Sequence, residues 1–183
     1  FNFRTIEFDS DSLILSRTGY TGGEGFEVYG SLEMTRKLFC KAVDFGVTPC
    51  GLGARDTLRF EAGLPLYGHE LGPDITPVEA GLSRFIDLSK PFKGRDVLRT
   101  QSEQRDRRRL IGLKLLDRGV PRPDYPVYYD GKQVGKVTSG GFAPYVKEYL
   151  AMALVKIPLD DANDKLFEIE IRGKKHRAEK VST

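Results

Sequence analysis

A glycine-rich segment between two strand-like stretches is the feature that most constrains how the first part of this chain can fold. Four glycines fall within residues 19–25, and the flanking residues 12–15 and 26–29 have strand-like composition. Because each glycine weakens a strand through its backbone entropy, the cluster predicts a sharp bend or a close approach of the backbone to another group. Taken alone, the segment is compatible with a hairpin turn and with a loop that holds a flat polar ligand.

The residues around this segment predict a mixture of strands and helices. Ser31 has the residue type of a helix N-cap and is followed by apolar residues at helical spacing, so a helix is expected from Ser31 to Gly46. Cys40 lies on this helix after two apolar residues and is expected to be a buried free thiol. A second helix is expected within residues 51–63 and a short one from Gly94. The predicted strands cover residues 3–8, 12–15 and 26–29.

Residues 100–109 contain no hydrophobic side chain and predict a linker. They separate a first domain, residues 1–99, from a second domain, residues 110–183. The linker carries four arginines, which would suit contact with a nucleic acid. No aromatic residues are interleaved with them, so a solvated linker is the favoured interpretation.

After the linker the pattern is β throughout, which predicts a small barrel or sandwich. Asp130-Gly131 is a strong signal for a tight turn, and Arg172-Gly173 is a weaker one. The basic run 174–177 is interpreted as an edge of this β domain rather than as a patch for polyanions. The chain stops soon after the last run, so the domain is expected to be truncated. The strand-like runs are residues 110–116, 126–129, 132–138, 151–157, 166–171 and 174–180.

Composition excludes several functional classes. The chain has 29 basic and 26 acidic residues, a near-balance that argues against a polyanion-binding domain and so against a nucleic-acid partner. No apolar run approaches the roughly 18 residues that a membrane span needs. Cys40 and Cys50 form no CxxC pair and provide too few ligands for zinc, and their small number suits a reducing compartment. His69 and His176 have no partners at the spacing of a catalytic triad.

Several motifs in a fixed order resemble the glycine-cleavage T-protein, or aminomethyltransferase, family. Residues 19–27, 54–64 and 66–71 carry the first three motifs, and residues 119–127 and 135–141 resemble the C-terminal barrel of that family. The resemblance runs over nearly all 183 residues but covers only the later part of such a protein. The chain is therefore expected to be a fragment without the N-terminal half. The resemblance implies an α+β fold class, in which the remainder of a folate-binding α/β body precedes an antiparallel β-barrel.

The resemblance also implies an activity. Members transfer the aminomethyl group of a lipoylated carrier protein, the H-protein, to tetrahydrofolate as co-substrate, and they release ammonia. The catalytic aspartate of the family lies in the missing half, so no catalytic residue is assigned to this chain and the fragment alone is expected to be inactive. No metal and no membrane partner are implied. The implied compartment is the bacterial cytoplasm or, in a eukaryote, the mitochondrial matrix.

Four residues match folate-site positions of the family. Glu27 matches a glutamate that contacts the pterin, where a carboxylate accepts two parallel N–H bonds. Tyr20 matches an aromatic contact to the folate. Arg55 matches a folate-site arginine that supplies fixed hydrogen-bond donors. Without the resemblance, Arg55 and the adjacent Asp56 would be interpreted as a surface ion pair. Arg122 corresponds to an arginine on the barrel side of the site.

Two departures and two alternatives accompany this resemblance. Gly23 stands where members usually have a carboxylate, and Arg84 stands where an aromatic residue often lies. One alternative is the folate-dependent domain of a sarcosine or dimethylglycine oxidising enzyme, which joins the same modules to a flavin domain. The other is a non-enzymatic folate-binding relative in iron–sulfur cluster maintenance. Such relatives carry a cysteine within the segment that corresponds to residues 18–24, where this chain has none.

Overall fold

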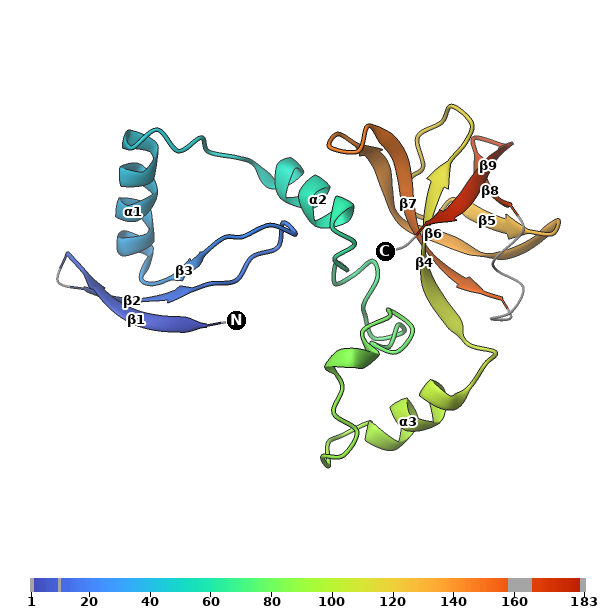
Figure 1. The fold of residues 1–183 in the computed structure, drawn as a ribbon, viewed down its shortest axis with the longest axis horizontal. Helices are drawn as coiled ribbons and strands as arrows, with labels where there is room; N and C mark the ends of the chain where they lie inside the picture. The colour runs from blue at the N-terminus through green and yellow to red at the C-terminus, as the bar shows by residue number, and fades with distance from the viewer. Residues whose placement is uncertain (1, 10, 158–165, 182–183) are drawn as a thin grey trace. The chain divides into compact units, whose positions relative to one another are not determined.

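The computed structural model describes residues 2–9, 11–157 and 166–181. The chain divides into two compact units, Phe1–Leu64 and Pro65–Thr183, and each is described by itself. The first unit contains a small sheet and two helices, and the second contains a short helical segment and a closed barrel (Figure 1). This mixed architecture with an antiparallel barrel confirms the predicted α+β fold class.

The first unit is built on a three-stranded antiparallel sheet in the order β1-β2-β3. The strands are β1 (Phe3–Phe8), β2 (Asp11–Ser16) and β3 (Glu27–Tyr29). Ser16 pairs with Glu27, so residues 17–26 form the loop that joins β2 to β3. The glycine-rich segment is therefore the connection of a wide hairpin, and Glu27 is the first residue of the strand that leaves it.

Helix α1 (Leu32–Asp44) begins where its predicted cap stands. The Ser31 side chain accepts a hydrogen bond of 3.2 Å from the Met34 amide, which supplies a partner for one of the first N–H groups of the helix. Met34 is fully buried, and it and Leu13 of β2 both lie against Gly30. The prediction of a buried Cys40 is wrong, because Cys40 is exposed. It lies about 240° around the helix from Met34, the one residue that α1 buries.

Helix α2 (Leu52–Glu61) confirms the second predicted helix and ends at the Ala62 C-cap. The residues of the second unit that precede the barrel are mostly irregular. They include a short 3-10 helix (Ser83–Phe85) and helix α3 (Arg95–Glu103), which begins where a short helix is predicted. Residues 76–82 form turns, with the Ala80 amide bonded to the Thr76 carbonyl oxygen at 3.0 Å.

The second unit contains a closed barrel of antiparallel strands in the order β4-β7-β6-β5-β8-β9. Its interior is apolar, and Leu113, Val127, Val155 and Phe167 are fully buried there. At the two predicted turns both residues have positive φ, with Asp130 at 51° and Gly131 at 75°, the backbone that a tight hairpin turn requires. The strands are β4 (Arg108–Leu115), β5 (Pro126–Tyr129), β6 (Lys132–Ala143), β7 (Glu148–Lys156), β8 (Phe167–Ile171) and β9 (Lys174–Val181).

The predicted linker is only partly irregular. Helix α3 continues through Glu103 and β4 begins at Arg108, which leaves residues 104–107 between them. The division into compact units falls after Leu64 instead. The domain boundaries at 99 and 110 stay a prediction.

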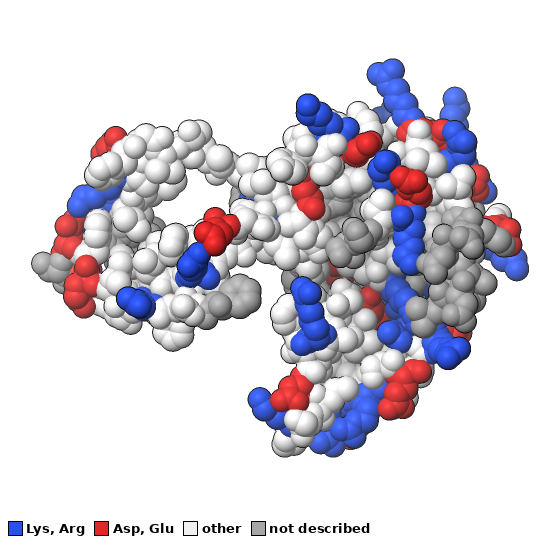
Figure 2. Space-filling model, viewed as in Figure 1, with Lys and Arg blue, Asp and Glu red and all other residues white. Residues whose placement is uncertain are grey.

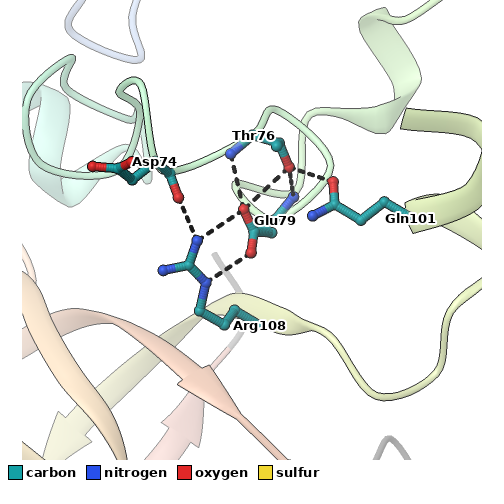
Figure 3. Close-up of polar contacts among 5 residues, drawn as sticks. All are labelled: Asp74, Thr76, Glu79, Gln101 and Arg108. Atoms are coloured by element: carbon teal, nitrogen blue, oxygen red, sulfur yellow. Dashed lines mark hydrogen bonds and ion pairs between the residues drawn. The ribbon is translucent and has the colours of Figure 1, made fainter. Parts of the chain in front are cut away.

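A buried carboxylate connects the irregular segment of the second unit to the first barrel strand (Figure 3). Glu79 is 5% exposed and pairs with Arg108 at 2.8 Å, and Arg108 also donates to the Asp74 carbonyl oxygen. The amide and hydroxyl of Thr76 bond to Glu79, and that hydroxyl also contacts Gln101 of α3. Burial raises the pKa of Glu79, but the bonds from Arg108 and Thr76 outweigh burial and hold that pKa below its ordinary value.

Candidate functional site

The loop between β2 and β3 borders a cavity of about 520 Å³ in the first unit. This size falls within the range of pockets that hold small molecules. Four of the nine described lining residues are glycines, which have no side chain to cover their backbone atoms. The lining residues are Asn2, Arg17, Thr18, Gly19, Gly22, Gly23, Glu24, Gly25 and Leu64.

Gly22 shows why this loop requires glycine. Its φ is +76°, a conformation that residues with a Cβ adopt rarely. A Cβ at this position would lie 2.5 Å from the Cβ of Ala62, at the end of α2. The loop therefore approaches α2 more closely than a side chain would permit.

Glu27 is held at the end of this loop by two hydroxyl groups. Its Oε2 atom accepts hydrogen bonds from the Thr18 hydroxyl and, at 3.3 Å, from the Tyr29 hydroxyl. The Thr18 hydroxyl also lies 3.0 Å from that of Ser16. Within the described residues, the Oε1 atom of Glu27 accepts no hydrogen bond. One carboxylate oxygen is thus fixed by the protein, and the other is open to a donor from outside.

Tyr20 and Arg55, which are far apart in the sequence, lie together. The guanidinium carbon of Arg55, on α2, is 4.8 Å from the centroid of the Tyr20 ring. This is a cation–π contact, and it limits the orientations open to both side chains. The pair combines an aromatic surface with several N–H donors, which is suited to a flat polar ligand.

The sequence suggests an ion pair between the neighbours Arg55 and Asp56, but the structure gives Asp56 a different partner. Asp56 pairs with Arg59 at 2.6 Å, whereas Arg55 contacts Tyr20. Arg59 is 1% exposed and also donates to the Leu64 carbonyl oxygen at 3.4 Å. Sequence reasoning did not single out Arg59, although the three-residue spacing between Asp56 and Arg59 on a helix is that of an ion pair. Arg59 anchors the end of α2 and leaves Arg55 available to the loop.

One departure from the family pattern lies beside an ion pair, and the other contacts an aromatic ring. Glu24, which follows Gly23, forms an ion pair with Arg17 at 2.7 Å. Both side chains are largely exposed, so this pair stabilises the loop by less than about 1 kcal/mol. Arg84 lies over the ring of Phe85, with 4.7 Å between the guanidinium carbon and the ring centroid.

The structure brings together some of the four predicted folate-site residues. Tyr20 and Arg55 are in contact, and Glu27 ends the loop that carries Tyr20. None of these three is among the residues that line the 520 Å³ cavity. Arg122 belongs to the second unit, where it lines a different cavity, of about 470 Å³. The roles of the four residues stay predictions.

The described residues provide neither a metal site nor a membrane-spanning helix. Among residues 2–9, 11–157 and 166–181, no group of three or more His, Cys, Asp or Glu side chains is arranged to hold a metal ion. Within the same ranges, no helix has the length and apolar character to cross a membrane. Basic and acidic residues are interspersed over the face of the second unit that Figure 2 shows.

Comparison with known proteins gives consistent matches over the whole chain. The model of the GCVT N-terminal domain matches residues 1–90, and the model of the glycine cleavage T-protein C-terminal barrel domain matches residues 108–183. An aminomethyltransferase of Moorella thermoacetica is 50% identical over 173 residues, which are 92% of this chain and 47% of that relative. An aminomethyltransferase of Exiguobacterium sibiricum is 45% identical over 184 residues, which are 100% of this chain and 51% of that relative.

A solved structure agrees with these sequence matches. The crystal structure of glycine cleavage system aminomethyltransferase T from Bartonella henselae matches with a TM-score of 0.84 and 32% sequence identity. The match covers 98% of this chain and 51% of that one. The chain therefore spans about half the length of the relatives that it matches.

Proposed function

Because this chain belongs to the glycine cleavage T-protein family, we propose that it forms the folate-binding part and the barrel of an aminomethyltransferase. The whole enzyme would transfer the aminomethyl group of a lipoylated carrier protein to tetrahydrofolate. The carbon of that group would bridge two folate nitrogens, ammonia would leave, and the carrier thiol would be regenerated. The carrier would be the H-protein, in the bacterial cytoplasm or the mitochondrial matrix.

The arrangement of Glu27 is the observation that carries the folate assignment. The pterin ring presents a 2-amino group and a ring N–H side by side, and a carboxylate oxygen is a natural acceptor for such donors. Oε1 of Glu27, which accepts no hydrogen bond from the described residues, would accept from the pterin. The hydroxyls of Thr18 and Tyr29 donate hydrogen bonds to Oε2 of Glu27. Their bonds limit rotation of the carboxylate before a ligand arrives, so less conformational entropy is lost on binding.

Tyr20 and Arg55 would supply the remaining contacts from the first unit. The Tyr20 ring offers an apolar face to a flat ring system, and Arg55 offers fixed donors to a carbonyl or carboxylate group. Their mutual contact places both functions at one point of the loop. Arg122 would contribute from the barrel unit.

No residue of this chain is proposed to carry out the transfer itself. The catalytic aspartate expected for the family would lie in the half that these residues do not match. Tetrahydrofolate and a loaded carrier protein added to residues 1–183 are therefore expected to give no methylenetetrahydrofolate above the uncatalysed rate. Ammonia release at the rate of a full-length relative would contradict this division of roles.

Titration with tetrahydrofolate under anaerobic conditions, followed by proton–nitrogen NMR, tests the binding proposal even when affinity is weak. Saturable shifts are expected in residues 17–29 and at Arg55. Glu27→Gln keeps the size of the side chain but removes its charge. It is expected to weaken binding about tenfold or more, because a hydrogen bond to a charged group contributes about 1.5–3 kcal/mol.

Glu33→Gln is the matched control for this titration. Glu33 is an exposed carboxylate on α1 that pairs with Lys37 at 3.1 Å, so its loss changes the net charge equally without touching the loop. Affinity is expected to stay as in the unchanged chain. Equal affinity of the Glu27→Gln and Glu33→Gln variants would remove Glu27 from the folate site.

The alternative of a sarcosine or dimethylglycine oxidising enzyme has no structural observation in its favour. The relatives described above are named aminomethyltransferases, and both family models are those of the T-protein. Aminomethyl transfer therefore stands as the proposed activity.

A further inference from the structure

A second cavity, of about 470 Å³, lies in the barrel unit and is lined almost entirely by basic or neutral groups. It is bordered by the chain that follows β4 and by the turn between β8 and β9. Four of its lining side chains are permanent cations and one is an imidazole, and no carboxylate is among the described lining residues. The lining residues are Arg118, Gly119, Val120, Arg122, Tyr125, Ile171, Arg172, Lys174 and His176.

Within the residues that the structure describes, the four cations of this cavity have no carboxylate partner. In the described part of the chain, no hydrogen bond or ion pair is formed by the side chains of Arg118, Arg122, Arg172 or Lys174. Elsewhere on this unit, some exposed cations do have carboxylate partners, as Lys136 does in Asp124. Arg177 binds Asp117 through two nitrogens, at 2.8 and 3.2 Å.

The alternation of side chains along a strand explains why the basic run 174–177 contains cations with carboxylate partners as well as a cation that lines the cavity. Successive side chains of a strand point to opposite sides, so Lys174 and His176 of β9 share one side, and Lys175 and Arg177 share the other. Lys175 pairs with Glu168 at 3.0 Å and Arg177 pairs with Asp117. The alternate pair lines the cavity instead. The basic run 174–177, which the sequence predicts at an edge of the β domain, therefore has two different sides. Lys175 and Arg177 on one side pair with carboxylates, whereas Lys174 and His176 on the other side line the cavity.

His176, which also lines the cavity, has a ring nitrogen without a hydrogen-bond partner among the described residues. Its Nδ1 atom is buried and forms no hydrogen bond to any residue that the structure describes. A Cβ on Gly119 would lie 3.1 Å from this atom and 2.8 Å from Cδ1 of Ile171. The absence of a side chain at Gly119 thus lets the backbone of this segment lie against the imidazole.

From these observations we infer that the cavity binds a small molecule carrying at least two anionic groups, either carboxylates or phosphates. Arginine forks bind such groups through two parallel hydrogen bonds, and clustered cations raise the local concentration of anions. The cavity volume suits a small molecule. Of these lining residues only Arg122 is also placed in the proposed folate site, so failure of the Glu27 prediction leaves this inference standing.

Pyrophosphate and tricarballylate are suitable probes for NMR titration of residues 1–183 at low ionic strength. Saturable shifts are expected in residues 118–125 and 171–176 with at least one probe. The double variant Arg118→Gln/Lys174→Gln is expected to weaken binding about tenfold or more, because two charge-assisted contacts are lost. The double variant Lys175→Gln/Lys180→Gln removes the same charge from the same strand region and is expected to change affinity less than about twofold.

Two results would overturn the inference. One is the absence of saturable shifts with both probes. The other is an equal loss of affinity in the two double variants, which would mean diffuse attraction to a basic surface rather than a site. The spectra of both variants also report whether the barrel has folded, so a loss of structure is not mistaken for a loss of binding.

Comparison of the probes identifies the source of the anionic groups. Tighter binding of pyrophosphate indicates a phosphate-bearing ligand. Tighter binding of tricarballylate, with competition by tetrahydrofolate that persists in Glu27→Gln, indicates the glutamate carboxylates of the folate. Tighter binding of tricarballylate without such competition indicates a separate polycarboxylate. Each of these outcomes supports an anion site in the barrel.

Discussion

The guanidinium of Arg55 lies 4.8 Å from the ring centroid of Tyr20, and this contact joins the glycine-rich loop to helix α2. Asp56 does not pair with Arg55 but forms an ion pair with Arg59, which is buried. Two adjacent helical residues thus have different tasks: Asp56 helps to anchor the helix end, and Arg55 reaches the loop. A double-mutant cycle isolates the energy of the Tyr20–Arg55 contact from the other contacts of each residue.

We expect Tyr20→Leu and Arg55→Gln to be coupled by about 0.5–1 kcal/mol, the range of cation–π contacts at exposed sites. The free energies of unfolding of the two single variants and the double variant, measured in urea, give this coupling. The control cycle combines Tyr20→Leu with Arg36→Gln, which removes an arginine from α1 rather than the arginine of α2 that contacts Tyr20. Additive effects of Tyr20→Leu and Arg55→Gln would show that the contact contributes nothing to stability.

Gly22→Ala is expected to destabilise the first unit by about 1–3 kcal/mol, since alanine at positive φ is strained and its Cβ would overlap Ala62. Gly23→Ala is the control. Gly23 has no positive φ, and the nearest atom to a Cβ there is Thr21 Oγ1 at 3.9 Å. Its cost is expected to stay below about 0.5 kcal/mol. Equal urea midpoints for the two variants would contradict the close approach of the loop to α2.

Gly135→Ala is expected to destabilise the barrel by about 2–3 kcal/mol, because β6 and β7 would have to separate. A Cβ at Gly135 would lie 2.1 Å from the Leu154 carbonyl oxygen, a backbone atom that cannot move independently. Gly141→Ala, in the same strand, has nothing within 4 Å and is expected to be neutral or slightly stabilising. Thermal unfolding of the two variants distinguishes these outcomes. A Gly135→Ala variant as stable as Gly141→Ala would be incompatible with the described approach of the strands.

The Glu79–Arg108 pair is expected to make the stability of the second unit depend on pH. The pKa of Glu79 is lowered by folding, so its contribution is fully present above the ordinary value of 4.5 and is lost as pH falls through the folded value. Arg108→Gln is expected to cost about 2 kcal/mol at pH 7 and less in acid. Arg95→Gln breaks an exposed 3.0 Å contact with Asp96 and should cost little at any pH. A cost of Arg108→Gln that does not vary with pH would exclude this role of Glu79.

Asp117 is expected to titrate well below other aspartates. The side-chain bonds from Arg177, together with its backbone amide, lower the pKa of Asp117 from 3.8 to about 2. Carbon NMR should therefore show the Asp117 carboxyl still charged at pH 3, and Arg177→Gln should raise its pKa toward 3.8. The stability from this pair is present above pH 3.8 and is lost as pH falls toward 2. Titration at an unshifted pKa in the unchanged chain would contradict the bidentate contact.

Much of the fold follows from local patterns. The Ser31 cap, the start of α3 after Gly94 and the two tight turns of the barrel were predicted from residue types alone, because capping and turn chemistry act over a few residues. The six strands were also predicted, but β6 continues to Ala143 rather than ending at residue 138. Gly140 and Gly141 have low strand propensity, and pairing with β7 outweighs that propensity.

The sequence by itself determined the α+β class, the order of the elements and the membership of the family, since periodicity and motif order can be read along the chain. Only the tertiary structure decided which side chains meet. It placed Arg55 on Tyr20, exposed Cys40, buried Glu79 against Arg108, and left Lys174 beside a cavity while pairing its neighbour Lys175. These outcomes depend on distant segments that loops bring together, and short-range patterns carry no information about such contacts.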